Sequence, residues 1–230
     1  MNYSYKLKVA SIIMIVISLL CGSFSNKVYA STYSIDETIT DRYIEECMQK
    51  GNLSGLAVVV VKDDQIIYQK NFGYADLETK AKITNNTHFE IASNSKAFTA
   101  LAILNLCKEG KISLSDKISN YLPQLKFTYN GTIEDITIQE CLEHRTGIPF
   151  SSIQKVSLSQ HSDNLLDAVQ SLSGMKLNFI PNEQFEYVSA NYDILGAIIQ
   201  VVSGVPYETY VTENVLNILN LNETVMYQED

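Results

Sequence analysis

A serine and a lysine three residues apart are the side chains of this sequence best suited to covalent chemistry. Ser93 and Lys96 stand at the start of an apolar segment, residues 97–107, whose pattern predicts a helix that ends at Gly110. Residues three apart in a helix share one face, with about 5–6 Å between their Cβ atoms. A serine hydroxyl is a weak nucleophile until a base takes its proton, and a lysine can be that base when burial or nearby cations lower its pKa. Because a helix N-terminus also favours negative charge, the pattern predicts a serine nucleophile with a lysine partner.

The same spacing of serine and lysine occurs three times, so the spacing alone is not specific. The three pairs are Ser93 with Lys96, Ser152 with Lys155, and Ser173 with Lys176. Only Ser93 joins a strand-like run, residues 89–92, to a long apolar segment, whereas Gly174 directly follows Ser173 and would end a helix there. A serine at a helix start is also a common N-cap. The local pattern therefore leaves two interpretations of Ser93 open, nucleophile and cap.

The first 30 residues have the three parts of a secretory signal peptide. Lys6 and Lys8 precede an apolar run at residues 9–21, and a polar stretch then ends in a Val-Tyr-Ala sequence at Ala30. The sequence therefore predicts cleavage near Ala30 and a secreted or cell-surface protein. Because the apolar run is shorter than the roughly 20 residues of a membrane-spanning helix, an uncleaved membrane anchor is the second interpretation.

Residues 31–230 have the size and composition expected of one globular domain. Apolar residues make up 46% of the full sequence and charged residues 19%. Without residues 1–30, which contain three lysines and no acidic residue, 14 basic and 26 acidic side chains would remain, a formal charge of −12. Such a surface argues against nucleic acid as the main partner. Cys47, Cys107 and Cys141 would also remain, and their odd number favours buried free thiols over a disulfide framework.

Hydrophobic periodicity predicts an α/β chain in which a hairpin near the start precedes a mostly helical block. Helices are expected at residues 35–50, 97–107, 111–125, 139–144, 164–172, 191–202 and 207–219, and hairpin strands at 56–61 and 65–72. Residues 73–87 are expected to be a loop and 185–188 a short strand, with no other strand after residue 90. His88, His144 and His161 are not spaced as metal ligands on one helix, so no metal site is predicted and His144 is interpreted as structural.

Three segments in order resemble the serine β-lactamase-like hydrolases of the class C type. Residues 89–96 (FEIASNSK) are similar to the nucleophile motif of that family, residues 142–148 (LEHRTGI) to its LLxHxSG segment, and residues 185–192 (FEYVSANY) to its Y-x-N motif. The family includes class C β-lactamases, D-alanyl-D-alanine carboxypeptidases, D-stereospecific aminopeptidases and related esterases. The resemblance covers residues 35–228 and implies a β-lactamase/transpeptidase-like fold, an antiparallel sheet flanked by helices.

The resemblance also implies roles for individual residues. Ser93 would be the nucleophile, and Lys96 with Tyr187 would move a proton between nucleophile and leaving group, since an ammonium lowers the pKa of a nearby phenol. The asparagine of the Y-x-N motif is replaced by Ser189, which lacks the separate donor and acceptor of an amide. Asn191, two residues further, is a second candidate for substrate binding. No cofactor is implied.

The third motif of the family, a K-T-G or H-x-G strand that contacts the substrate carboxylate, does not occur in the sequence. We therefore expect residues 31–230 to be a domain without its C-terminal part, with an incomplete sheet and an unpaired edge on the apolar strand at 56–61.

The resulting hypothesis is a secreted serine acyl-hydrolase that works through an acyl-enzyme. Its substrates would be D-amino-acid peptides, β-lactams or esters at the cell wall, which makes peptidoglycan and wall-polymer esters the expected partners. The missing motif keeps two alternatives open: a non-catalytic module that binds penicillin or wall peptides, and an inactive truncated gene product.

Overall fold

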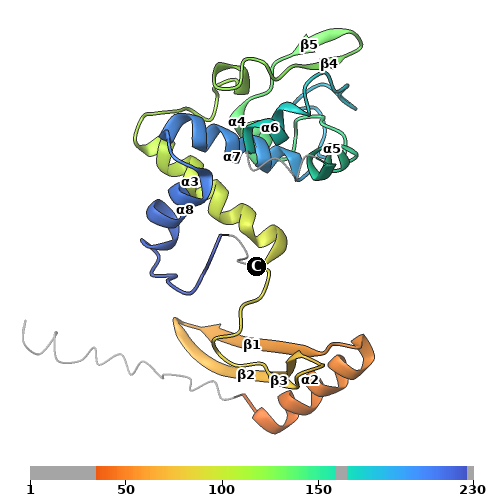
Figure 1. The fold of residues 1–230 in the computed structure, drawn as a ribbon, viewed down its shortest axis with the longest axis vertical. Helices are drawn as coiled ribbons and strands as arrows, with labels where there is room; N and C mark the ends of the chain where they lie inside the picture. Colours follow the sequence, from red (N-terminus) through yellow and green to blue (C-terminus); the bar gives the residue numbers. More distant parts are fainter. Residues whose placement is uncertain (1–34, 159–164, 227–230) are drawn as a thin grey trace, which may run out of the picture. The chain divides into compact units, whose positions relative to one another are not determined.

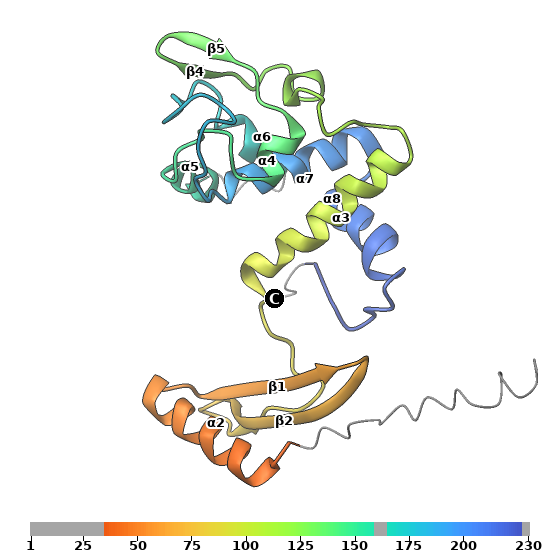
Figure 2. The ribbon, with the colours of Figure 1, turned by 180° about the vertical axis from the view of Figure 1, so that it is seen from behind.

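The structure of the protein is a computed structural model that describes residues 35–158 and 165–226. These residues form two compact units, the first ending at Thr87 and the second beginning at His88. Figure 1 and Figure 2 show both units from opposite sides. The predicted signal peptide, with Ala30, lies outside the described residues, as does His161.

The first unit is a three-stranded antiparallel sheet with one helix against it. Helix α2 (Glu37–Gly51) precedes β1 (Gly55–Lys62), β2 (Gln65–Asp76) and β3 (Ala81–Lys82), and the sheet order is β1-β2-β3. Asp36 caps α2 by accepting a hydrogen bond from the Ile39 N–H. Asp63 and Asp64 form the loop between β1 and β2, and both have the positive φ that a type I′ hairpin requires. Figure 1 shows α2 lying along one face of this hairpin.

Alternation along β1 divides its side chains between a face covered by α2 and an exposed face. The covered side is a small core of Ile44, Met48 and Tyr68, with Ile35, Leu56, Val58, Val60 and Phe72 packed against it. On the other side, Val59 and Val61 are 57% and 59% exposed. Within the described residues β1 pairs with β2 alone. The first unit thus contains the predicted apolar strand with an unpaired edge.

The predicted hairpin is longer than expected, because β2 continues past Phe72 into the segment predicted to be a loop. Gly73 lies opposite Gly55 with a φ of 72°, and a Cβ built on it would lie 2.1 Å from the Ser54 carbonyl oxygen. Only glycine fits such a close approach of two backbones. Beyond this bend, Tyr74 pairs with Lys82 of β3.

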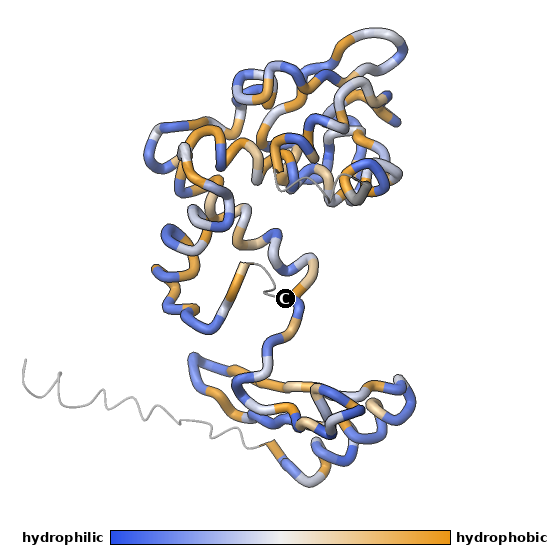
Figure 3. Tube along the Cα trace, in the orientation of Figure 1, coloured by the Kyte–Doolittle hydropathy of each residue, from blue (hydrophilic) through white to orange (hydrophobic). Residues whose placement is uncertain are grey.

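The second unit is mostly helical. A 3₁₀ turn, η1 (Ala92–Asn94), leads into α3 (Ser95–Lys108), and the further elements are η2 (Ile118–Asn120), β4 (Phe127–Tyr129), β5 (Thr132–Glu134), α4 (Ile138–Leu142), α5 (Ser152–Leu158), α6 (Leu165–Gln170), α7 (Ala190–Ser203), α8 (Tyr207–Val211) and the π-helical η3 (Thr212–Leu216). Helix α7 contacts α3, α4, α6 and α8 (Figures 1 and 2). Its middle part, from Ile194 to Ile199, is buried in the core, and Figure 3 shows that much of the second unit's interior chain is hydrophobic. The helices predicted at 97–107, 139–144, 164–172 and 191–202 are therefore present with shifted ends.

The helix predicted at residues 111–125 is wrong. Only the 3₁₀ turn η2 forms there, because local side-chain hydrogen bonds compete with a helix. The Asp116 carboxylate accepts from the Ser113 N–H and from the Tyr121 hydroxyl, which holds the segment in turns. The helix predicted at 207–219 is present from Tyr207 to Leu216, where α8 continues without a break into the π-helical η3.

A short strand was expected at 185–188 and no other strand after residue 90, and both expectations are wrong. Strands β4 and β5 form a hairpin whose loop, Asn130-Gly131, has positive φ at both residues, a strong type I′ signal that the sequence analysis missed. Residues 185–188 and 89–91 have no regular secondary structure and are not paired as strands. Helix α5 was also not predicted.

The three cysteines of the described residues are free thiols, but only Cys141 is fully buried. Cys47 is exposed, because the stripe of α2 that faces the sheet contains Ile44 and Met48 instead. As for the membrane, no single helix within the described ranges is long and apolar enough to cross one. Helices α7 and α8, the latter extended by η3, pass that test of length and composition only as a pair bent by 82°.

Candidate active site

Ser93 lies in the 3₁₀ turn that begins α3, and its hydroxyl does not cap the helix. The N-cap of α3 is Asn94, and that residue makes no side-chain capping bond. Ala92, directly before Ser93, has a φ of 45°, a left-handed conformation that is uncommon outside glycine. Ser93 itself is exposed. The turn therefore presents the Ser93 hydroxyl on the surface, available for contacts with other side chains.

Two proton donors converge on the oxygen of Ser93. The Tyr187 hydroxyl donates to Ser93 Oγ at 2.6 Å, and Lys96 Nζ donates to the same oxygen at 3.1 Å. Lys96 Nζ also donates to Ser189 Oγ at 3.4 Å. The Lys96 ammonium lies 5.1 Å from the centre of the Tyr187 ring and 5.7 Å from that of Tyr192. The structure thus brings together four of the five residues that the sequence analysis selected.

Tyr187 reaches Ser93 from a segment 94 positions away in the chain. This segment, residues 185–188, leads directly into α7, which places Ser189 at the start of that helix. The Glu186 carboxylate accepts hydrogen bonds from the Phe150 N–H and the Asn178 amide. A set of contacts with the 144–150 and 178 regions thus replaces the strand pairing that the sequence analysis expected.

The main charge of the site is the Lys96 ammonium, which has no carboxylate within ion-pair distance among the described residues. The hydrogen bonds of Lys96 go to hydroxyls. The neighbouring Lys96, and then the hydrogen bond with Ser93, lower the pKa of Tyr187 below its usual range. A phenol in this position can be both a base and an acid near neutral pH more readily than an ordinary tyrosine.

Asn191, the fifth selected residue, does not line the site. It is fully buried, and its side-chain oxygen accepts a hydrogen bond from the Thr146 hydroxyl at 2.8 Å. Residues two apart in a helix point in different directions, so Asn191 cannot share the face of Ser189. The structure therefore does not bring Asn191 together with the other four selected residues.

The other two serine–lysine pairs lack this geometry. Ser152 is buried, and its hydroxyl has no hydrogen-bond partner among the described residues. The Ser173 hydroxyl donates to the Gln124 carbonyl and accepts from the Lys126 N–H, so it stabilises a turn. Only the pair at the start of α3 is joined to a tyrosine.

Three neighbours of the site were not selected from the sequence. The buried His144 ring lies 4.5 Å from that of Tyr187, and Tyr192 lies near Lys96. Burial raises the pKa of Asp193 to about 6, with the charge of Lys96 opposing this shift. Asp193 follows Ser189 by four residues, so the helical spacing could have placed it on the same face. Across the described residues, no group of three His, Cys, Asp or Glu side chains is arranged to hold a metal ion.

Known proteins share this arrangement of elements. A family model described as Beta-lactamase matches residues 40–230. Protein flp of Staphylococcus aureus (strain MRSA252) is 39% identical over 190 residues, 83% of this chain and 38% of that protein. Penicillin-binding protein 4* of Bacillus subtilis (strain 168) is 31% identical over 176 residues, 74% of this chain and 37% of that protein. The octameric penicillin-binding protein homologue from Pyrococcus abyssi has a TM-score of 0.72 at 31% identity, with 82% of this chain and 44% of that chain covered.

This chain spans less than half the length of these relatives. The predicted β-lactamase/transpeptidase-like fold, with mixed helices and small antiparallel sheets, is confirmed. The family model covers most of the chain, and all three of the motifs used for the prediction lie inside the matched range. The chain belongs to the beta-lactamase family.

Proposed function

We propose that this chain carries the nucleophile of a serine acyl-transfer enzyme, and that Ser93 is that nucleophile. The single observation that carries the proposal is the hydrogen-bonded set of Ser93, Lys96 and Tyr187, in which the tyrosine oxygen is 2.6 Å from Ser93 Oγ. Family membership supports the same kind of chemistry.

In the proposed reaction Tyr187 takes the proton of Ser93. When Tyr187 is ionised, the 2.6 Å hydrogen bond reverses, so that the serine hydroxyl donates to the phenolate. The Ser93 oxygen attacks the substrate carbonyl carbon as its proton passes to Tyr187, and the carbonyl oxygen becomes an oxyanion. The bond to the leaving group then breaks, and Tyr187 returns the proton to that group, which leaves an acyl-enzyme. In the second half of the reaction water takes the role of the nucleophile: its proton passes to Tyr187 as it attacks the acyl carbon, and Tyr187 then returns that proton to Ser93.

Lys96 and the main chain have supporting roles in this proposal. The Lys96 ammonium favours the ionised form of Tyr187, whose pKa it lowers. Its second hydrogen bond, to Ser189 Oγ, keeps the ammonium between Ser93 and the start of α7. The Ser93 N–H is the proposed donor to the oxyanion, since such donors contribute a large part of catalysis in acyl transfer.

The proposed substrates are D-amino-acid peptides, β-lactams or esters at the cell wall, handled by a secreted or surface-bound protein. Relatives named penicillin-binding proteins and the N-terminal sequence pattern support this proposal. One observation favours a second candidate function, a module that is acylated but turns over poorly. Ser189 offers only a hydroxyl where an amide is expected, and Lys96 already uses that hydroxyl as an acceptor.

Covalent labelling tests the nucleophile directly. The full chain is treated with a fluorophosphonate or a fluorescent penicillin, and the adduct is mapped by mass spectrometry. We expect one label, at Ser93, which is lost in Ser93→Ala and kept in the matched control Ser173→Ala. A label at Ser152 or Ser173, or one that survives Ser93→Ala, contradicts the proposal.

A further inference from the structure

Tyr187 lies outside regular secondary structure, yet a single residue binds the main chain on both sides of it. The Glu186 N–H donates to the His144 carbonyl oxygen at 2.9 Å, and the Val188 N–H donates to His144 Nδ1 at 3.3 Å. The imidazole also contacts the Tyr187 ring, with centroids 4.5 Å apart and planes 42° apart. His144 therefore contacts Tyr187 through its ring and the flanking peptide groups, while the tyrosine hydroxyl points to Ser93.

A second series of hydrogen bonds decides which nitrogen of His144 is protonated. The Thr146 hydroxyl accepts from the Ile148 N–H at 3.2 Å and donates to Asn191 Oδ1 at 2.8 Å. The amide N–H of Asn191 is then directed at His144 Nδ1, 3.3 Å away. The Val188 N–H points at the same nitrogen. Two donors meet at Nδ1, so this nitrogen has to be an acceptor, and the proton of the neutral ring is on Nε2.

The backbone at His144 indicates that this placement is maintained against strain. His144 has a φ of 56°, in the left-handed region that costs free energy for residues other than glycine. The next residue, Arg145, is tied down by hydrogen bonds from its guanidinium to the side chain and carbonyl of Asn182. The surroundings thus fix an unusual conformation whose ring and carbonyl both reach the tyrosine segment.

We infer that His144 is a positioning residue, which orients Tyr187 toward Ser93 only while its imidazole is neutral and protonated on Nε2. The inference rests on the proposed function of the Ser93 site. His144 acts through Tyr187, because its hydrogen bonds go to the flanking peptide groups and to Asn191.

This role makes the site sensitive to acid. Protonation of Nδ1 would turn the acceptor into a donor that faces two other donors, and the tyrosine segment would lose its support. The titratable groups that face the imidazole are Lys96 from α3, Tyr187, and Tyr192 from α7. Burial, and then the charge of Lys96, lower the pKa of His144 below its ordinary 6.5. The neutral form therefore persists below pH 6.5 and is lost only as the pH falls through this lowered pKa.

Two substitutions separate the acceptor from the ring. His144→Asn places an amide oxygen near the position of Nδ1, tolerates a left-handed backbone and cannot titrate. His144→Phe keeps an aromatic ring but has no acceptor, and His144→Gln, whose polar atoms lie further from the backbone, replaces it should the Phe variant not fold. The rate constant for labelling of Ser93 by the fluorophosphonate is measured in the full chain from pH 4 to pH 9, with folding checked by circular dichroism.

We expect His144→Phe or His144→Gln to be labelled at least about 10-fold more slowly, since misplacement of a reacting group by ~1 Å can cost about 10²-fold. His144→Asn should stay within about 3-fold of the wild type above pH 7. As the pH falls through the lowered pKa of His144, the ratio of the Asn variant to the wild type should rise, because only the wild type loses its acceptor. A ratio that does not change with pH, or equal rates in the Phe and wild-type proteins, overturns the inference.

A second measurement does not depend on activity. The ¹⁵N shifts of histidine-labelled full chain, assigned with His144→Asn, should show Nδ1 without a proton and Nε2 with one at pH 7. A proton on Nδ1 overturns the inference even if Ser93 is labelled normally. Conversely, an unlabelled Ser93 together with the expected shifts contradicts the proposed function and leaves the hydrogen-bond geometry of His144 supported.

Discussion

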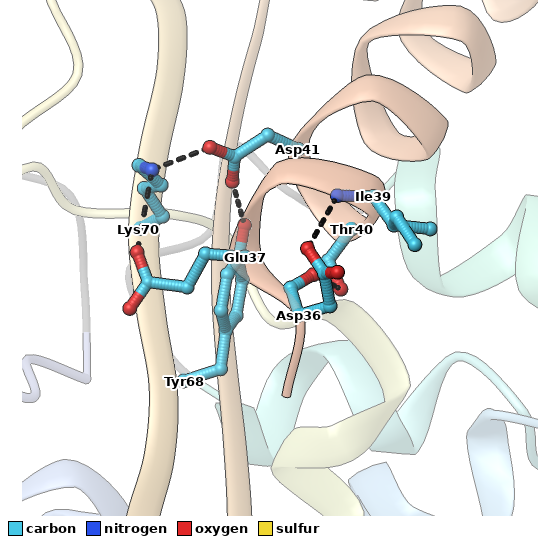
Figure 4. A network of polar contacts seen from close by, with 7 residues as sticks. All are labelled: Asp36, Glu37, Ile39, Thr40, Asp41, Tyr68 and Lys70. Carbon is cyan, nitrogen blue, oxygen red and sulfur yellow. Dashed lines mark hydrogen bonds and ion pairs between the residues drawn. The ribbon is translucent and has the colours of Figure 1, made fainter. Parts of the chain in front are cut away.

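In each unit of the protein a lysine and a tyrosine donate hydrogen bonds to one common acceptor. The two clusters differ in the chemical group of that acceptor. In the first unit, drawn in Figure 4, Tyr68 and Lys70 both donate to the Asp41 carboxylate, at 2.6 Å and 2.5 Å. A second carboxylate, that of Glu37, lies 3.8 Å from the lysine. In the second unit Tyr187 and Lys96 share the hydroxyl of Ser93 instead.

The surroundings of each cluster set the direction in which the pKa of its tyrosine shifts. Burial, and then the hydrogen bond to Asp41, raise the pKa of Tyr68 to about 12, because the phenolate would face a carboxylate. Among the described residues no carboxylate lies within ion-pair distance of Lys96, and its ammonium lowers the pKa of Tyr187. The same residue types therefore make a structural link between α2 and β2 in one unit and a candidate proton carrier in the other.

The largest expected effect comes from breaking the second cluster. Tyr187→Phe should lower turnover or Ser93 labelling by roughly 10²–10⁴-fold, the range for loss of general acid–base help. Lys96→Ala should cost about as much, and the double variant should not multiply the losses, because the groups act as a unit. Tyr68→Phe, which breaks the first cluster, is the matched control and should leave the rate unchanged. A wild-type rate in Tyr187→Phe would remove Tyr187 from the site.

A smaller effect should follow from changing Asp193, a carboxylate whose pKa the charge of Lys96 influences. The pKa of Asp193 is raised from 3.8 to about 6, so its contribution to stability is complete below pH 3.8 and is lost as the pH rises through about 6. Asp193→Asn should therefore gain up to about 3 kcal/mol in the free energy of unfolding at pH 7–8, at about 1.4 kcal/mol per pKa unit, and little at pH 4. Urea unfolding at several pH values measures this.

Asp116 provides the control of opposite sign. Its hydrogen bonds with Tyr121 and the Ser113 N–H lower its pKa, so its contribution is present above pH 3.8 and is lost as the pH falls. Asp116→Asn should therefore destabilise the protein at neutral pH. If both variants shift stability in the same direction with pH, the assignment of Asp193 is wrong.

The pKa values of the two tyrosines can also be compared directly, and the expected difference between them is a few pH units or less. Absorbance of the phenolate is followed from pH 7 to pH 12 in the wild type and in the two Phe variants. Tyr187→Phe should remove a component that titrates below pH 10, whereas Tyr68→Phe should remove one that titrates near pH 12. Removal of the same late component by both variants would show that Lys96 does not activate Tyr187.

The smallest effect concerns the exposed face of the first unit. Val59 and Val61 form an apolar surface beside the edge of β1 that pairs with no other strand of the described residues, and such an edge is a template for association between chains. We expect residues 31–230 to self-associate and to unfold at low denaturant, and Val59→Lys to reduce the association measured by sedimentation. Ile39→Lys, on the outer side of α2 at 57% exposure, is the control. A monomeric wild type with a sharp unfolding transition would contradict this prediction.

Local patterns in the sequence were sufficient for the elements that depend on near neighbours. The spacing of Ser93 and Lys96 determines that the two side chains lie on one side of the chain where the 3₁₀ turn η1 leads into α3, because residues three apart in such turns are neighbours. The Asp63-Asp64 turn, with a continuous apolar run before it and an alternating run after it, likewise determines the hairpin. Where the prediction failed, a local signal was overlooked, as at Asn130-Gly131, or hydrogen bonds to a side chain such as Asp116 replaced the expected helix.

Tertiary structure alone decided which side chains meet Ser93. The motif made Ser189 and Asn191 two candidates for substrate binding, but the packing of α7 against α4 and α3 turns Ser189 toward Lys96 and buries Asn191 against His144. Tyr187 is in place because His144 holds both peptide groups beside it across more than 40 residues of chain. A sequence pattern specifies residue types and local spacing, whereas the direction of a side chain at the start of a helix depends on which face the core covers.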